Sequence, residues 1–248
     1  MITSGPSRDV VLAVGAHPDD LEFQCGGTLA ALVACGIEVH MAVLTDGSCG
    51  SFGLPAEEIA RVRLGEARRS AEIVGAASFH HLGMHDGASD VTPDRRRDIV
   101  NLVRRVRATV LLGHPPVDYH LDHRNASELV YQARCAAAMR NFADEPPLPA
   151  TPHLAYFDTE QAVDFEPQVW IDISDHIDVK RRMLAAHESQ LDLMAKMYGE
   201  DMIEMVDRHA RFRGGQRATR YAEAYRGSGT YPEPDGALRF LVRTIEGR

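Results

Sequence analysis

The first half of the chain alternates short apolar runs with longer amphipathic segments, and this alternation restricts the fold more than any other feature. Four apolar runs are typical of strands, at Val10–Val14, Val39–Thr45, Phe79–Leu82 and Thr109–Gly113. Helical spacing of apolar residues marks the segments between and after them, Gly26–Gly36, Ala56–Val74, Asp94–Arg107 and Arg124–Arg140. Helices of this length can cross over between parallel strands with the usual right-handed connection. The predicted fold class is therefore α/β, with a Rossmann-like, mostly parallel sheet and helices on both faces.

The second half, from about residue 143, is less regular. Ala143–Pro152 is rich in proline, so we expect a loop or an edge crossing there. Further predicted elements are strands at His153–Phe157 and Val169–Ile173, helices at Asp175–Leu191 and Met202–Phe212, and an exposed, turn-rich segment at Gly227–Gly236. No internal repeat or low-complexity linker divides the chain. We therefore expect residues 1–248 to form a single domain.

Composition excludes several classes of protein. Of the 248 residues, 44% are hydrophobic and 25% are charged, the balance of a globular chain with a real core. The formal net charge of −9 argues against a nucleic-acid partner, because such binding depends on clustered lysine and arginine. No apolar run approaches the roughly 20 residues of a membrane-spanning helix, and the polar stretch Met1–Asp9 lacks the layout of a secretory signal. The lack of a long apolar run predicts no membrane partner. The four cysteines form no CxxC pair, which favours the reducing environment of the cytoplasm.

A cluster of titratable residues directly follows the first predicted strand. The stretch Ala16–Glu22 reads AHPDDLE, and in parallel sheets ligands bind beyond the carboxyl ends of the strands. Burying such groups is costly unless they are paired. His17 and Asp20 are three residues apart, so one helical turn would present both to a single point, where a divalent cation is the simplest partner. The alternative interpretation is that Asp19 and Asp20 only cap a helix that begins near Glu22.

A second cluster, His114–His123, follows the fourth predicted strand, and in it His120 and His123 are again three residues apart. Two histidines and one carboxylate, drawn from two strand ends, form the ligand set of a catalytic zinc site that keeps one position for water. The same set suits ferrous iron. Because both clusters end strands of the same predicted sheet, we expect one metal site. The other histidines are interpreted as surface or packing residues: His40, His80, His81, His85, His153, His176, His187 and His209.

The two clusters together resemble the PIG-L/LmbE family of metal-dependent N-deacetylases. That family carries the pattern AHPDDxE followed by a PDxHxDH-type segment, and this chain has AHPDDLE and, at Asp118–His123, DYHLDH. Similar segments occur at Gly26–Leu29, Thr45–Gly47, Asp86–Gly87 and Arg220–Tyr225, so the resemblance covers most of the chain. One departure is Val117, where relatives often carry a polar residue.

The resemblance implies a role for each motif residue. Zn²⁺ would be the metal, with Fe²⁺ as the alternative. For Arg63, the substrate contact given below has an equally weighted alternative, that it is only an exposed arginine on a helix. The implied metal ligands are His17, Asp20 and His123; the general base is Asp19; the oxyanion is stabilised by a protonated His120 that Asp122 orients; and Arg63, Asp86 and Tyr221 contact the substrate.

The implied activity is hydrolysis of the N-acetyl group of a small molecule that contains N-acetylglucosamine, releasing acetate and a free amine. The compact chain looks most like the bacillithiol-pathway deacetylase, which acts on N-acetylglucosaminyl malate. Another glycoside or a natural product is an equally weighted substrate, so the substrate stays open. Related proteins are often homo-oligomers. One alternative is an amidase that cleaves a mycothiol-type thiol conjugate. Another is a non-catalytic, metal-dependent sugar-binding module, but such a module needs neither Asp19 as a base nor His120 as an oxyanion donor.

Overall fold

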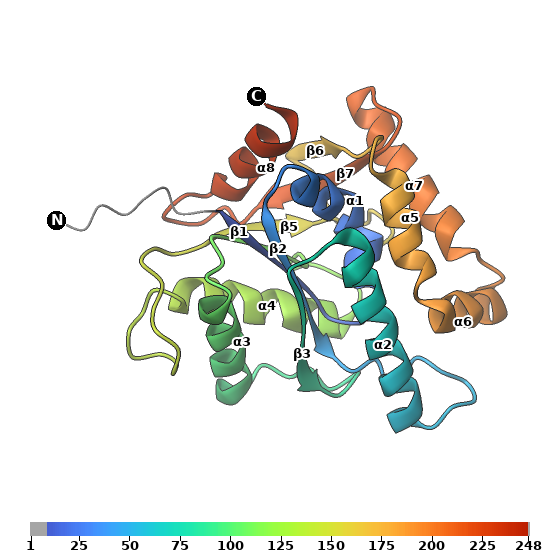
Figure 1. Ribbon diagram of the computed structural model, residues 1–248, viewed down its shortest axis with the longest axis horizontal. Helices are drawn as coiled ribbons and strands as arrows, with labels where there is room; N and C mark the ends of the chain where they lie inside the picture. Colours follow the sequence, from blue (N-terminus) through green and yellow to red (C-terminus); the bar gives the residue numbers. More distant parts are fainter. Residues whose placement is uncertain (1–8, 248) are drawn as a thin grey trace.

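Seven strands form one sheet in the computed structural model, which describes residues 9–247 (Figure 1). The strands are β1 (Val10–Gly15), β2 (Glu38–Thr45), β3 (Ser78–Met84), β4 (Val110–Gly113), β5 (His153–Phe157), β6 (Val169–Asp172) and β7 (Ala222–Gly227). Their spatial order is β3-β2-β1-β4-β5-β7-β6. The first five strands pair in parallel, and β7 runs antiparallel to both β5 and β6. The predicted α/β class with a mostly parallel sheet is confirmed.

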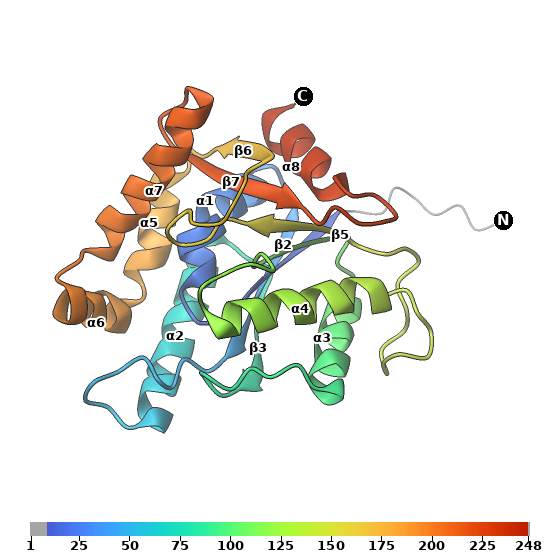
Figure 2. The same ribbon diagram turned by 180° about the vertical axis from the view of Figure 1, so that it is seen from behind.

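Helices cover both faces of the sheet. They are α1 (Asp20–Ala34), α2 (Ala56–Val74), α3 (Pro93–Arg105), α4 (Leu121–Ala136), α5 (Ile177–Ala185), α6 (Glu188–Tyr198), α7 (Met202–Arg217) and α8 (Gly236–Glu246). One core packs α1, α2, α5, α7 and α8 against the sheet, and the other packs α3 and α4 against the opposite face. In Figure 1 α1 and α2 lie in front of the sheet, whereas α4 lies in front in Figure 2. Alternate residues of β1 enter the two cores, which is why its sequence is continuously apolar.

Helix α1 begins at Asp20, earlier than the predicted start at Gly26. The carboxylates of Asp20 and Glu22 lie in its first turn, where the helix dipole favours negative charge. Gly27 lies within this helix because close packing leaves no room for a side chain there. A Cβ at Gly27 would lie 2.7 Å from the Cδ1 of Ile173.

The predicted helix over Asp175–Leu191 is wrong as a single element, because α5 ends at Ala185 and α6 begins at Glu188. At the break, His187 has ψ 56°, outside the helical range, and its side chain is fully buried. Its Nε2 lies 3.3 Å from Oε1 of Glu22 on α1. The backbone thus leaves the helix where this imidazole enters the core, a tertiary contact that local periodicity does not encode.

Two elements near the C-terminus were not predicted. Strand β7 inserts between β5 and β6, and α8 begins where the exposed turn was expected to end. The segment between them is turn-rich as predicted, with residues 231–235 exposed, although its bounds Gly227 and Gly236 are buried. No helix within the described range 9–247 is long and apolar enough to cross a bilayer. Apart from Asp9, the polar stretch Met1–Asp9 lies outside the described residues.

Candidate metal and active site

The carboxyl ends of β1 and β4 bring the three predicted metal ligands together. His17 lies in the loop after β1, Asp20 is the first residue of α1, and His123 lies in the first turn of α4. Asp20 Oδ2 accepts a hydrogen bond from the backbone N–H of His17 at 2.7 Å and lies 3.7 Å from Nδ1 of the same histidine. Asp20 Oδ1 lies 3.3 Å from His123 Nε2. All three side chains are buried, and Asp20 lies beside both histidines. Their role as metal ligands stays a prediction.

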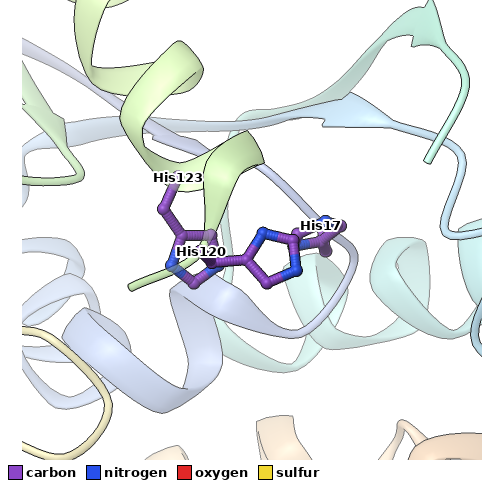
Figure 3. A group of neighbouring side chains, drawn as sticks. All are labelled: His17, His120 and His123. Atoms are coloured by element: carbon purple, nitrogen blue, oxygen red, sulfur yellow. The ribbon is translucent and has the colours of Figure 1, made fainter. Parts of the chain in front are cut away.

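A third imidazole completes this cluster. Figure 3 shows His17 facing the rings of His120 and His123, which come from the beginning of α4. The ring centroids lie 4.7 Å apart for His17 and His120, and 4.8 Å apart for His120 and His123. One nitrogen from each of the three rings lies within 4.8 Å of the others. Geometry therefore admits His120 as a ligand. Two further groups of this kind are Asp20, His114 and His123, and His17, Asp86 and Asp122, so the three predicted ligands are shared between groups and do not form one of them.

Asp118 lies beside Nδ1 of His123, the ring nitrogen that does not face Asp20. Its Oδ2 lies 3.1 Å from His123 Nδ1, while its Oδ1 accepts a hydrogen bond from the backbone N–H of His120 at 2.8 Å. A carboxylate at the remote nitrogen of a histidine is the usual arrangement around a metal ligand, because it fixes the ring and leaves the other nitrogen for the metal. Asp118 belongs to the second motif, but no role was predicted for it.

The charges of the cluster fit a divalent cation. Burial would lower the pKa of His123, but the carboxylates of Asp20 and Asp118 overcome burial and raise that pKa to about 10. The imidazole thus holds a proton because two buried carboxylates require positive charge beside them. A metal ion satisfies the same requirement by replacing that proton. Two imidazoles and one carboxylate, all buried, are a donor set suited to zinc.

Asp19 lies beside the cluster in an unusual backbone conformation, with φ 120° and ψ −21°. Such conformations persist where the surrounding structure imposes them, often at functional sites. Burial raises the pKa of the Asp19 carboxyl, the nearby Asp20 carboxylate raises it further, and Arg63 partly opposes the shift. A carboxylate whose pKa is raised towards neutrality is better suited to exchange protons with a reacting group.

Arg63 is buried, so the interpretation of an exposed helix arginine is wrong. Its Nη2 donates to Pro18 O at 2.8 Å and to Asp19 Oδ2 at 3.2 Å, and its Nη1 donates to Gly47 O at 3.0 Å. These contacts turn the guanidinium towards Asp19 and the chain around it. They support a positioning role for Arg63 in place of the predicted direct contact with substrate.

Gly47→Ala is expected to lower the turnover number, kcat, by about 10- to 100-fold, because small misplacements of catalytic groups are costly. The φ of Gly47 is +67°, and a Cβ there would lie 2.7 Å from Arg63 Nη1. The matched control is Gly36→Ala. The φ of Gly36 is +77°, but a Cβ there would meet no non-neighbouring atom within 4 Å. Steady-state kinetics of both variants make the test. Equal kcat values would show that displacing Arg63 has no consequence.

The carboxylate of Asp122 does not orient the His120 ring, which corrects the prediction. It lies 3.2 Å from His17 Nε2 and accepts hydrogen bonds from Gly87 N–H and the Ser89 hydroxyl. The backbone N–H of Asp122 instead donates to His120 Nδ1 at 3.2 Å. That bond makes Nδ1 the acceptor and leaves a proton on Nε2.

The surroundings of His120 disfavour the protonated form that the resemblance implied. Burial lowers its pKa, and the neighbouring His17 and His123 lower it further. With Nδ1 accepting from the chain, the neutral ring presents its Nε2–H as a donor. The donor capacity expected of His120 is thus available without a charge.

The two other predicted substrate residues have different surroundings. Asp86 joins the cluster, since its Oδ1 lies 3.3 Å from His17 Nε2 and its Oδ2 accepts from the Cys49 N–H at 3.1 Å. Tyr221 does not join the cluster. It is buried, and its hydroxyl accepts hydrogen bonds from Arg181 at 3.1 Å and Arg211 at 3.2 Å. The predicted contact of Tyr221 with substrate is therefore corrected, because its hydroxyl is engaged by arginines of α5 and α7.

A cavity of about 1060 Å³ opens beside the cluster and shares His120 with it. Its walls also include Tyr119 and Glu160, whose side chains are joined by a hydrogen bond from the Tyr119 hydroxyl. Neither residue was predicted to be functional, and Glu160 carries no motif that could have marked it. A cavity next to buried titratable groups is the default place for a small-molecule substrate.

Comparison with known proteins agrees with this geometry. The sequence profile of the family described as GlcNAc-PI de-N-acetylase, PIG-L, matches residues 12–134. The chain is 35% identical to a diacetylchitobiose deacetylase of Thermococcus kodakarensis, over 89% of this chain and 84% of that protein. It is 28% identical to a probable N-acetyl-alpha-D-glucosaminyl L-malate deacetylase of Bacillus cereus, over 84% and 91% of the two chains.

Solved structures share the fold. A conserved protein of Thermus thermophilus, 30% identical, superposes with a TM-score of 0.76 over 90% of this chain and 94% of that one. The 4-carboxy-2-hydroxymuconate hydratase of Pseudomonas putida, 24% identical, gives a TM-score of 0.75 over 88% and 95%. The hydratase shows that this fold also occurs in an enzyme with another named reaction. The extent and identity of the Thermococcus match, together with the profile match over both motifs, show that the chain belongs to the PIG-L family.

Proposed function

We propose that this chain is a metal-dependent N-deacetylase that hydrolyses the acetamide of a small molecule containing N-acetylglucosamine. The observation that carries the proposal is the position of Asp19, a carboxylate held by Arg63 at 3.2 Å, in the same loop as the buried His17 and directly before the buried Asp20. A binding module would need no such base. The deacetylases among the relatives support the same reaction class.

We assign His17, Asp20 and His123 as the residues that hold the metal, with zinc favoured by two imidazoles and one carboxylate and ferrous iron as the alternative. When bound, the cation would polarise the amide carbonyl and lower the pKa of water. Asp118 keeps the His123 ring turned towards the other ligands. Asp86 and Asp122, both near His17 Nε2, hold that ring in the same way.

Side chains of the protein then carry out the proton transfers and stabilise the oxyanion. Asp19 accepts a proton from the attacking water as the water oxygen bonds to the carbonyl carbon. The Nε2–H of His120 donates a hydrogen bond to the oxyanion that develops. When the C–N bond breaks, the proton on Asp19 passes to the departing nitrogen, which leaves as the free amine. Arg63 holds the Asp19 carboxylate in place throughout.

His123→Ala is expected to lose the bound metal, whereas His120→Ala is expected to keep one equivalent and lose about 100- to 1,000-fold in kcat. Metal content measured by mass spectrometry after dialysis, together with kcat, separates ligand from donor. His85→Ala is the control, since that side chain is 82% exposed. If His120→Ala lost metal as His123→Ala does, His120 would be a ligand and the oxyanion role would fall.

Acetate release from simple N-acetylglucosamine glycosides, with and without a chelator, tests the proposed reaction. We expect release that the chelator abolishes and added Zn²⁺ restores. Saturable sugar binding without acetate release would indicate a binding module. Cleavage of a thiol conjugate's amide, or hydration of an unsaturated acid, without acetate release would indicate an amidase or a hydratase.

Cytoplasmic location and homo-oligomeric assembly stay predictions.

A further inference from the structure

The cavity beside His120 has walls from four separate parts of the chain. Phe23 comes from α1, Tyr119 and His120 precede α4, residues 160–162 follow β5, and the remainder comes from α6, α7 and the turn between them. The complete lining is Phe23, Tyr119, His120, Glu160, Gln161, Ala162, Met194, Tyr198, Glu200, Met205, Arg208, His209 and Phe212. Because His120 belongs to both, a substrate whose acetamide lies at the cluster extends into this space.

Aromatic and thioether side chains form much of the wall. Tyr198 and Phe212 are 63% and 54% exposed, although both are large apolar residues. Exposed apolar surface of this kind commonly marks a ligand-binding groove. Flat aromatic rings offer an apolar face against which the C–H face of a sugar ring can pack.

The charges of the wall disfavour an anionic ligand. Among the described residues that line the cavity, Arg208 is the only lysine or arginine, and it donates to Glu200 at 2.7 Å. Glu160 adds a second carboxyl group. Arg63, which was expected to contact the substrate, is engaged by Pro18, Gly47 and Asp19. A carboxylate such as that of malate would find no unpaired guanidinium on this wall.

His209 supplies a fixed polar group. Its Nε2 lies 2.9 Å from Oδ2 of Asp158, a buried residue directly after β5 that is also paired with Arg213. In the neutral ring, a carboxylate at Nε2 keeps the proton there and leaves Nδ1 as an acceptor. The ring lies 6.3 Å from that of Phe23, centroid to centroid. The predicted role of His209 as a plain packing residue thus overlooks its position in the cavity wall.

We propose that this cavity holds the group linked to the acetamido sugar, and that this group is an uncharged, hydroxyl-bearing ring such as a second pyranose. His209, positioned by Asp158, accepts a hydrogen bond from one of its hydroxyls, and Phe212 packs against its C–H face. Both are specificity residues for the proposed deacetylation, on which this inference rests. This inference favours a neutral linked group over the malate that the resemblance suggested.

The test compares kcat/KM for acetate release from three substrates: methyl N-acetylglucosaminide, diacetylchitobiose and N-acetylglucosaminyl malate. We expect the disaccharide to be the best substrate. His209→Phe keeps a ring without the nitrogen acceptor and is expected to lower the disaccharide-to-monosaccharide ratio about 5- to 10-fold, mainly through KM, as for one lost hydrogen bond. Phe212→Ala changes an exposed position and should lower the same ratio without affecting folding.

Phe142→Ala, an exposed aromatic outside the cavity wall, is the matched control and should leave the ratio within twofold of wild type. Malate as the preferred aglycone, or an unchanged ratio in both cavity variants, would overturn the inference while leaving the deacetylation intact. Failure of the wild-type protein to release acetate from all three substrates would instead overturn the proposed function, and this inference with it.

Discussion

Asp19→Asn is expected to lower kcat for acetate release by about 100- to 10,000-fold, the usual contribution of a general base, while the protein keeps its metal. Asparagine has nearly the same shape and can still accept the Arg63 hydrogen bond seen at 3.2 Å. It also tolerates the φ of 120° at this position better than most residues. What it cannot do is take a proton from water. The measurement is kcat together with the metal content of the same preparation.

The control for this variant is Asp94→Asn, whose side chain is 88% exposed on α3. It should retain wild-type kcat. Turnover of Asp19→Asn within a few-fold of wild type would remove Asp19 as the base. Loss of metal from Asp19→Asn would instead place that carboxylate among the ligands.

Lys180→Met is expected to destabilise the fold by about 3–5 kcal/mol, because it leaves a buried carboxylate uncompensated. Lys180 Nζ donates to Phe23 O at 2.7 Å and to the Glu223 carboxylate. Glu223 also accepts the N–H groups of Gly27 and Thr28, at 2.9 and 2.7 Å, in the middle of α1. Both charged side chains are 3% exposed. This pair fastens α1, whose first residue is Asp20, to α5 and β7.

Urea unfolding measures the effect. Lys196→Met is the control, since its pair with Asp192 on α6 is 66% and 61% exposed and contributes at most about 0.5 kcal/mol. The double variant Lys180→Met, Glu223→Gln should recover part of the loss by removing the unpaired charge. A free energy of unfolding for Lys180→Met within about 1 kcal/mol of wild type would contradict this account of the pair.

The parallel half of the fold could be predicted because each strand there is buried on both faces and each crossover helix shows its apolar face in sequence. Helix α2 has the predicted bounds for this reason. The C-terminal part resisted prediction because its elements depend on distant partners. Strand β7 carries the buried Glu223, which the polar–apolar pattern cannot place, and α5 ends where His187 meets Glu22.

In the candidate site, too, some features could be predicted from the sequence and others could not. Motif spacing predicted which side chains meet, since His17 and Asp20 follow one strand and His123 follows its neighbour in the sheet. The partners of the supporting residues were not predictable. Asp122 faces His17 instead of the His120 ring, and Tyr221 binds arginines of α5 and α7, because tertiary packing decides which way each side chain turns.

The central claim is that His17, Asp20 and His123 hold one catalytic divalent cation. A crystal structure of the zinc-loaded protein, with anomalous data collected at the zinc edge, tests it most directly. We expect a single peak about 2.0–2.2 Å from a nitrogen of His17, a nitrogen of His123 and a carboxylate oxygen of Asp20. No peak among these residues, or a peak held by a set that leaves out Asp20, would contradict it.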